Sequence, residues 1–355
     1  MRLMLTRYVV RAVMIGAVLV LAVLVSLDSV FTFIGEVDQV GRGDYSLGVA
    51  AVYMLLSMPS RIYELFPAAV AIGGILGLGG LAANSELTVM RAAGISSRQI
   101  AGMVLQAGLL LMVAIVAIGE GLAPPAQQHG ERMRASAIAG QGDARGARGV
   151  WVRDGDRFVS VGTLLPNQVL RDVDIYEFAD HRLQRALHVD RAIFVDGRWQ
   201  LHDVDTTRID AAGELVRGHR ARAVWDELVR PELVDLLAVS PMSLSIWRLA
   251  GYVEYLRDNR LEATRFELAF WQKVATPLST LVMLLLALPV IFGSLRSSGV
   301  GQRVFVGSLI GVGYFLASEL FAHVGIVYGL AAPVAALAPV VLFATVGIVL
   351  LRRVN

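Results

Sequence analysis

The chain contains a single lysine, Lys273, in the sequence Trp-Gln-Lys-Val-Ala. A P-loop needs its lysine at the end of Gly-x-x-x-x-Gly-Lys-Ser/Thr, where the ammonium group reaches the outer phosphates of a nucleotide. Lys273 lacks that context, so the sequence predicts that this chain binds no ATP through a P-loop. If ATP and Mg²⁺ drive its function, a partner chain must bind them.

Other catalytic and metal-binding patterns are also absent from the sequence. It has no Gly-x-Ser-x-Gly elbow and no His-Glu-x-x-His pair. It has no cysteine, which excludes disulfides and thiolate metal ligands. Five of its six histidines fall in one polar stretch without metal-ligand spacing. We therefore expect no catalytic residue and no metal or cofactor bound by this chain.

Three acidic residues lie inside long apolar stretches: Asp28, Glu120 and Glu319. A charge surrounded by lipid is costly and usually marks a functional position. All three are expected toward the outer ends of their stretches, where water is close. That placement favours a role at an interface or in a cavity over a role in a proton relay.

A basic cluster, Glu131-Arg132-Met133-Arg134, follows the third apolar stretch, and Arg42 and Arg61 are expected at a similar depth. Guanidinium groups at a membrane surface pair with the phosphates of lipid headgroups. The alternative is that these side chains simply extend to the interface without a specific ligand. The candidate residues for binding a lipid phosphate or lining a cavity are Arg42, Arg61, Arg132, Arg134, Asp28 and Glu319.

These residues are set in a strongly apolar chain. Of its 355 residues, 55% are hydrophobic and 17% are charged, and the mean hydropathy is +0.61. Such values are typical of an integral membrane protein, and a net charge of +2 gives no reason to expect a nucleic-acid partner. Six stretches are long enough to span a bilayer, for which about 20 residues suffice: 9–33, 62–83, 100–123, 269–292, 304–324 and 331–351.

The limits of these stretches carry further predictions. The first is too long for a signal-peptide core and is interpreted as a retained helix. Leu47–Met58 is too short to span alone, and we interpret it as an extension of the second helix, bent at Pro59. The third span is predicted to end at Pro124-Pro125, where the residues become polar. Small residues that would allow close helix packing are clustered in the second span: Gly73, Gly74, Gly77, Gly79 and Gly80.

Between the third and fourth spans, from about residue 127 to 265, the chain is polar and reads as an all-β insertion. Val150–Val161 and Ile193–Leu201 both alternate around an Asp-Gly pair, which predicts two hairpins. Val173–Phe178 is a further predicted strand. Ser243–Leu256 has an apolar side formed by Ile246, Leu249, Ala250 and Val253, and predicts an amphipathic helix leading back to the membrane. The predicted domains are 1–123, 124–265 and 266–355.

The stretch Asn84–Ile100, NSELTVMRAAGISSRQI, lies between the second and third spans and contains start and stop signals of a short helix. Asn84 is a predicted N-cap, Gly94 a predicted left-handed stop, and Ser96 with Gln99 a predicted capping box for the next helix. So short a helix must pack on something to be stable. The stretch is either an ordinary membrane loop or a docking helix for a cytoplasmic partner. The docking candidates are Ser85, Glu86, Leu87, Met90, Arg91 and Gly94.

Arginine counting predicts the orientation. The N-terminus, the 84–99 loop, the 293–303 loop with Arg296 and Arg303, and the C-terminus all fall on one side, and each is basic. That side is predicted to be the cytoplasm. The β insertion then lies outside, in the periplasm.

The sequence resembles the LptF/LptG family of lipopolysaccharide export permeases over nearly its whole length, with the LptG branch the closer match. The resemblance rests on Arg7-Tyr8, the run Ser85–Gly94, Gly119-Glu120 with Ala123-Pro124, Gly149-Val150-Trp151, Ile291–Arg296 and Val327-Tyr328-Gly329. It implies six transmembrane helices with an inserted periplasmic β-jellyroll, in a multi-pass protein of the inner membrane.

The resemblance also implies partners. An LptF-like permease would complete a heterodimer, and an LptB-like ATPase dimer would receive the Ser85–Gly94 coupling helix, with Glu86 and Arg91 as polar contacts. Lipopolysaccharide would enter between the first and fifth helices and pass to LptC-like and LptA-like bridge proteins. Arg134 matches a basic position near the cavity mouth.

Three alternatives stay open at this point. The chain could be the LptF paralogue, with the same mechanism and the other place in the heterodimer. It could be a scaffold that presents a β domain and transports nothing, in which case Glu86→Ala should have no effect. A proton-driven carrier is the weakest alternative, because no acid is predicted at mid-membrane.

Overall fold

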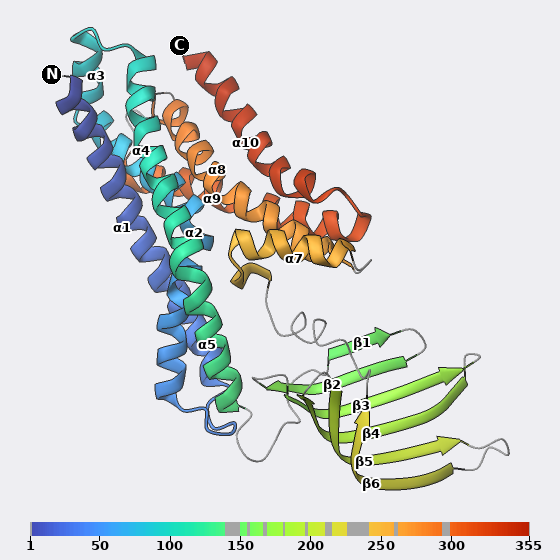
Figure 1. Ribbon diagram of the computed structural model, residues 1–355. Helices are drawn as coiled ribbons and strands as arrows, with labels where there is room; N and C mark the ends of the chain where they lie inside the picture. Colours follow the sequence, from blue (N-terminus) through green and yellow to red (C-terminus); the bar gives the residue numbers. More distant parts are fainter. Residues whose placement is uncertain are drawn as a thin grey trace. The chain divides into compact units, whose positions relative to one another are not determined.

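The computed structural model describes residues 2–138, 150–154, 157–165, 169–179, 182–195, 198–209, 215–225, 241–258, 262–292 and 299–354. The chain forms two compact units. The helical unit comprises Met1–Thr32, Leu56–Gln127 and Pro241–Asn355, and the sheet-bearing unit comprises Phe33–Leu55 and Gln128–Ser240. Figure 1 labels the elements along the chain.

Within the described ranges, six helical segments are long and apolar enough to cross a membrane, which confirms the predicted spans. The helices of these segments are α1 (Arg2–Val37), α2 (Leu47–Ala83), α4 (Ser97–Ala117) with its continuation, α8 (Thr264–Phe292), α9 (Val300–Tyr328) and α10 (Ala332–Val354). Leu47–Met58 is continuous with the second span, as predicted, because Pro59 and Pro67 are both accommodated inside α2.

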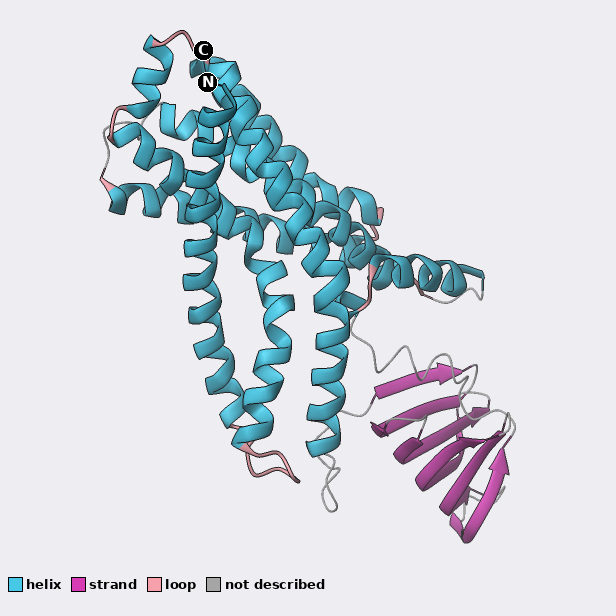
Figure 2. Ribbon diagram, turned by 60° about the vertical axis from the view of Figure 1, so that its left-hand side comes forward, coloured by secondary structure: helices cyan, strands magenta, loops and turns pink. Residues whose placement is uncertain are grey.

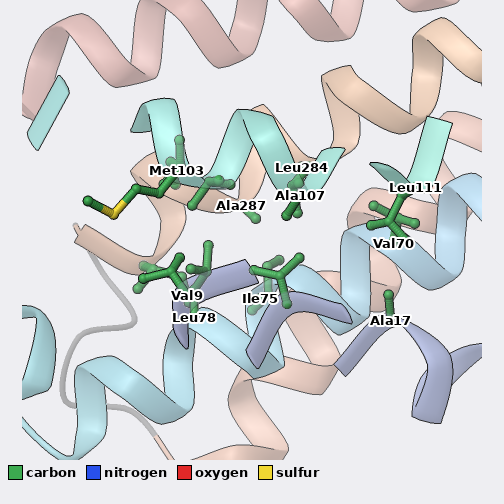
Figure 3. Packing of buried hydrophobic residues seen from close by; sticks show 14 of the residues in the cluster. Val9, Ala17, Val70, Ile75, Leu78, Met103, Ala107, Leu111, Leu284 and Ala287 are labelled. Carbon is green, nitrogen blue, oxygen red and sulfur yellow. The ribbon is translucent and has the colours of Figure 1, made fainter. Parts of the chain in front are cut away.

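The main apolar core of the helical unit is formed by buried residues from α1, α2, α4 and α8. Figure 3 shows Val9, Ile75, Ala107 and Leu284 converging in it. Helix α1 can approach α2 closely because Gly73 and Gly77 carry no side chain there. A Cβ on either glycine would collide with the backbone of α1.

The third span does not end at Pro124-Pro125, so that prediction is wrong. Helix α4 passes into a π-helical turn, η1 (Ile118–Leu122), and then directly into α5 (Ala123–Ile138). The two prolines occupy the first turn of α5, where a missing N–H and a fixed φ are tolerated. The sequence predicts a stop at these prolines because proline usually ends a helix. In the first turn of α5 the same residues are tolerated, and the sequence does not show that α5 begins there.

The sheet-bearing unit contains six antiparallel strands in sequential order: β1 (Val150–Asp154), β2 (Arg157–Leu165), β3 (Val169–Ala179), β4 (Arg182–Val195), β5 (Arg198–Ile209) and β6 (Leu215–Trp225). Figure 2 shows them as consecutive magenta arrows. The pairings of β1 with β2 and of β4 with β5 confirm the predicted hairpins. The Asp-Gly turns include Gly155, Asp196 and Gly197, which lie outside the described residues.

The buried face of the sheet shifts by one residue along three central strands. The core includes Leu170 and Val173 on β3, and Leu201 and Val204 on β5, so the alternation of period two is broken between them. Asp172 and Asp203 lie at these breaks with φ of 51° and 54°. A left-handed residue reverses which face the following side chains occupy, and aspartate tolerates that conformation better than a β-branched residue does.

The chain re-enters the helical unit through a short 3₁₀ turn, Pro241–Ser243, and α7 (Ile246–Asp258). Leu249 and Leu256 are buried, so α7 is the amphipathic helix that the sequence predicts. Its contacts are with α8, where the Tyr252 and Phe266 rings meet edge to face with centroids 4.9 Å apart. Ala250, predicted on the apolar side, is exposed.

Figure 1 shows the N-terminus, the C-terminus and α3 (Glu86–Ala92) at one end of the helical unit, and Figure 2 shows the two termini there. Arg303, predicted in the loop before the fifth span, instead lies in the first turn of α9 and is only 2% exposed. Its guanidinium packs over Gly79 of α2, where a side chain would displace it.

Candidate functional site

Within the stretch Asn84–Ile100 the chain forms the short helix α3 (Glu86–Ala92), which begins one residue later than predicted. Asn84 is not its N-cap, so that prediction is wrong. Ser85 takes the cap position and makes no side-chain cap bond. Its φ of 61° is left-handed, and this turn directs the chain out of α2. The Asn84 amide donates instead to the Glu86 carboxylate, with Nδ2 3.4 Å from Oε1.

The end of α3 is as predicted. Gly94 has φ of 87°, its N–H donates to the Arg91 carbonyl, and the Ile95 N–H donates to the Met90 carbonyl at 3.1 Å. This pair of bonds is a Schellman motif, which satisfies carbonyls that a helix end leaves without partners. The motif fixes the direction in which the chain leaves α3.

The capping box that opens α4 is confirmed. The Gln99 N–H donates to the Ser96 hydroxyl at 3.3 Å, and the Ser96 N–H donates to the Gln99 side-chain oxygen at 3.0 Å. These reciprocal bonds satisfy two donors that otherwise lack partners at the helix start. The turn between α3 and α4 is therefore fixed by local hydrogen bonds on both of its sides.

The two faces of α3 differ in their surroundings. Leu87 and Met90 are buried in the main core of the helical unit and supply the packing that so short a helix needs. Val89 is 65% exposed, and Arg91 is exposed at the edge of a small cavity lined by Ala82, Leu87, Thr88, Arg91, Ile291 and Phe292. Glu86 interacts with Tyr8 of α1. The side of α3 that carries Val89 faces away from Leu87 and Met90 and is open.

The best-formed polar cluster of the sheet-bearing unit surrounds Arg134 of α5. Its Nε lies 3.0 Å from the Glu36 carboxylate, and its guanidinium lies 5.5 Å from the centre of the Tyr53 ring. The Tyr45 hydroxyl donates to the same Glu36 oxygen at 2.7 Å. The Asp44 N–H donates to the Ala137 carbonyl at 2.8 Å, so the loop after α1 is fastened to the end of α5.

The Tyr45 hydroxyl is held in its neutral form by this arrangement. Burial, first, and the hydrogen bond to Glu36, second, raise the pKa of Tyr45 to about 12. Tyr45 therefore remains a hydrogen-bond donor at any physiological pH. Arg134 is 32% exposed and Glu36 12% exposed, so the guanidinium still reaches the surface while it is paired.

The other predicted lipid-site residues do not join this cluster. Arg42 donates to the Gln39 side chain at 2.9 Å, and Arg132 is exposed on α5. Three predicted residues belong to the helical unit instead. There Asp28 lies 3.6 Å from Arg61, and Glu319 lies 3.5 Å from His323 on the exposed side of α9. The structure thus separates the predicted set into isolated pairs and the Arg134 cluster.

The third intramembrane acid, Glu120, pairs with the only lysine of the chain. The Lys273 Nζ lies 3.1 Å from Glu120 Oε1 and is 3% exposed. The second carboxylate oxygen of Glu120 accepts from the Ile246 N–H at 2.6 Å. Lys273 also lies 5.7 Å from the centre of the Tyr63 ring.

Several of these residues were missed in the sequence. Glu36, Tyr45 and Tyr53 carry no motif, and their meeting with Arg134 depends on the packing of three segments far apart in the chain. The role of Lys273 could have been predicted from the sequence, because a lone lysine in an apolar helix requires a buried partner. Glu120 was the predicted intramembrane acid that could have been matched to it.

Two of the histidines belong to a polar ladder on the exposed face of the sheet. His188 pairs with Asp174 at 2.7 Å and His219 pairs with Asp205 at 2.8 Å. Strand register places His188 opposite Asp205 as well. No group of three metal-ligand side chains is found within the described residues.

Among the described residues, six helices long and apolar enough to cross a membrane, a short helix between the second and third of them and an inserted antiparallel sheet are the features of a multi-pass membrane protein with an inserted β domain. The chain belongs to the LptF/LptG family: residues 7–353 match the model of the family described as lipopolysaccharide export system permease LptF/LptG.

Curated relatives agree with this assignment. The lipopolysaccharide export system permease protein LptG of Escherichia coli strain K12 is 33% identical over 352 residues, which covers 98% of each chain. The LptG protein of Haemophilus influenzae is 33% identical over 342 residues, 96% of this chain and 95% of its own. The similarity therefore includes the helices and the inserted sheet together.

Proposed function

We propose that the chain is the LptG-type permease subunit of a transporter that extracts lipopolysaccharide from the inner membrane and passes it to a periplasmic bridge. The observation that carries this proposal is α3, a helix whose C-terminal end is fixed by a Schellman motif, with the capping box of α4 directly after it, and whose Val89 side is open. The fixed end holds the exposed residues of α3 in one position, as a contact with a partner requires. The end-to-end similarity to LptG proteins supports the same function.

The energy source lies in a partner. The sequence has no nucleotide-binding motif, so an LptB-like ATPase dimer would bind ATP and Mg²⁺ and hydrolyse the ATP. Glu86 and Arg91 would contact that ATPase, while Leu87 and Met90 transmit its movement, because they are packed into the core of the helical unit. Ser85 and Gly94 set the direction of the helix through their left-handed turns.

The assembly and orientation complete the proposal. An LptF-like permease forms the other half of a heterodimer, and LptC-like and LptA-like proteins receive the lipid. The N-terminus, α3 and the C-terminus lie in the cytoplasm, because the loops on that side carry the arginines. The sheet then lies in the periplasm.

Arg134 is the residue most suited to a lipid phosphate. Its guanidinium is partly exposed, is held over the Tyr53 ring, and has one carboxylate partner that a phosphate could replace. An arginine can bind a phosphate through two parallel hydrogen bonds, which favours this exchange. Arg42 and Arg132 are exposed and would add charge without fixed geometry, and the Asp28–Arg61 pair and Glu319 would line the path of the lipid.

Co-purification tests the proposal. The chain is expressed with LptF-like and LptB-like partners, extracted in detergent, and compared with Glu86→Ala and Arg91→Ala. Arg98→Ala is the matched control, because Arg98 is an exposed arginine in the first turn of α4 beyond the Schellman motif. We expect both α3 variants to lose the ATPase or its activity about tenfold, and the control to retain both.

The scaffold alternative gives a different result in the same experiment. If the chain purifies without an ATPase and Glu86→Ala changes nothing, α3 is only a loop and the transporter proposal fails. If the complex forms and hydrolyses ATP but moves no lipopolysaccharide between vesicles, the coupling role stands and the substrate is wrong.

A further inference from the structure

The π turn η1 is followed by two prolines, so the Gly119 carbonyl is among those that lack a helical partner. In this turn the Ala123 N–H donates to the Ile118 carbonyl, five residues earlier. The next donor in that register would be Pro124, which has no N–H, so the Gly119 carbonyl cannot be satisfied from within the helix. Lys273 fills this position, with Nζ 3.1 Å from the Gly119 oxygen.

The Lys273 ammonium is enclosed by three partners. The Gly119 carbonyl and Glu120 Oε1 both accept from it at 3.1 Å, and the Tyr63 ring lies beneath it. The Tyr63 hydroxyl donates to the Lys273 carbonyl at 3.2 Å. The position of the lysine is therefore set by both its backbone and its side chain, from α2 and from η1.

A buried ion pair of this kind is poorly explained by stability alone. Removing two charges from water costs about as much as their attraction returns, so apolar side chains of similar volume would hold the helices equally well. What apolar side chains cannot do is accept a hydrogen bond. The second Glu120 oxygen accepts from the Ile246 N–H at 2.6 Å, and Ile246 is the first residue of α7.

The place of this bond in the chain gives it a role. The chain leaves for the sheet through α5, which follows η1, and returns from the sheet at α7. One carboxylate therefore joins the outgoing connection to the returning one, and Lys273 joins both to α8. The other end of α7 is fixed by Arg257, whose Nε donates to the Glu267 carboxylate of α8 at 2.7 Å.

We propose that Glu120 and Lys273 are positioning residues for transport, which hold the start of α7 against η1 so that movements of α8 reach both connections to the sheet together. The inference rests on the proposed transport function, and it adds a specific requirement to it. The requirement is the hydrogen bond between Glu120 and the Ile246 N–H, and the charge pair serves to orient Glu120 for it.

Ile246→Pro removes the donor of this bond together with the Ile246 side chain. Proline is suited to the first position of a helix, and Ser245 before it is not helical, so α7 should still form. Ile246→Ala is the matched control, because it removes the side chain and keeps the N–H. In the complete complex with its permease and ATPase partners, we expect ATP hydrolysis within about twofold of wild type for both variants. ATP-dependent transfer of lipopolysaccharide to acceptor vesicles should fall about tenfold in Ile246→Pro alone.

A second pair of variants separates the charge from the acceptor. Glu120→Gln with Lys273→Met removes both charges but keeps an amide oxygen for Ile246. Glu120→Leu with Lys273→Met removes the acceptor as well. We expect the first double variant to retain more lipid transferred per ATP than the second, at similar thermal stability. If the complex containing Ile246→Pro does not assemble, these two double variants still test the positioning role.

The outcomes separate this inference from the proposed function. Equal transfer per ATP in the two double variants, or wild-type transfer by Ile246→Pro, would overturn the positioning role while leaving the transporter intact. A wild-type complex that hydrolyses ATP but transfers no lipopolysaccharide would instead remove the proposed function.

Discussion

Two glutamates near the ends of the predicted spans each pair with a basic residue at almost the same distance. The two pairs differ in how far the basic side chain is exposed to water. Glu120 and Lys273 are 3.1 Å apart, and the lysine side chain is 3% exposed. Glu36 and Arg134 are 3.0 Å apart, and the arginine side chain is 32% exposed. The first ammonium is enclosed by a carbonyl and a ring, while the second guanidinium keeps an open side.

The comparison shows that burial, more than distance, decides what an ion pair can do. A charge that is cut off from water cannot exchange its partner without a large free-energy cost, so the Glu120 pair is suited to fixing a position. A charge at the edge of water can exchange a carboxylate for a phosphate, so the Arg134 pair is suited to binding.

The largest effect is expected at the enclosed pair. Lys273→Met leaves the Glu120 carboxylate, whose side chain is 23% exposed, with the Ile246 N–H as its remaining partner. Breaking a fully buried pair from one side costs about 3–5 kcal/mol, so we expect a loss toward the lower end of that range here, whereas Arg134→Met, which leaves Glu36 bonded to Tyr45, should cost about 1 kcal/mol or less. Thermal unfolding of the purified chain in detergent measures both losses. Equal destabilisation by the two variants would mean that burial does not distinguish the pairs.

The sequence predicts the local features of this protein well, because neighbouring residues determine them. The six spans follow from apolar length, the end of α3 follows from Gly94, and the start of α4 follows from Ser96 and Gln99, whose partners lie within three residues. The start of α3 was misplaced at Asn84 because a left-handed Ser85 has no strong sequence signal.

Ion pairs between residues far apart in the sequence cannot be predicted from neighbouring residues. Glu120 and Lys273 are 153 residues apart in sequence, and the sequence alone gives no reason to join them except that each is an isolated charge. Arg134 is predicted from the sequence as a lipid-site residue, and its pairing with Glu36 depends on how α1 and α5 meet. The continuation of the helix through Pro124 was missed because it depends on the π turn before it.

The next largest effect is expected on lipid binding. Arg134→Ala should reduce the affinity of the complex for lipopolysaccharide about tenfold, because a bidentate hydrogen bond to a phosphate is lost. Arg132→Ala, two residues away on the same helix and exposed, is the matched control and should have a much smaller effect. Lipid whose phosphates have been removed should bind both variants and the wild type alike. A tenfold loss for Arg132→Ala as well would reduce the site to general surface charge.

A smaller effect of opposite sign is expected from Glu36→Gln. The amide keeps an acceptor for Arg134 and Tyr45 but removes the negative charge that competes with phosphate. Affinity for lipopolysaccharide should rise by about threefold, and its dependence on salt should become steeper, since a free guanidinium is screened more readily. An unchanged or weaker affinity would show that Glu36 supports the phosphate site and does not compete with it.

The smallest effect concerns Tyr45, whose titration reports on the state of Glu36. The pKa of Tyr45 is raised to about 12, first by burial and then by its hydrogen bond to Glu36. Because the neutral hydroxyl is favoured in the folded state, the stabilisation is complete below pH 10 and is lost as the pH rises from about 10 to about 12. The difference in tyrosinate absorbance between wild type and Tyr45→Phe measures this titration.

In Glu36→Gln the same difference titration should move down from about 12 while remaining above the ordinary tyrosine value, because burial persists. Tyr53→Phe provides the control, since that ring lies against Arg134 while the hydroxyl bonded to Glu36 is that of Tyr45. If the Tyr45 titration does not respond to Glu36→Gln, the carboxylate is not held against the hydroxyl, and the half-exposed pair is looser than its 3.0 Å separation indicates. A clear shift would establish a spectroscopic probe of Glu36 that could be followed while lipopolysaccharide is added.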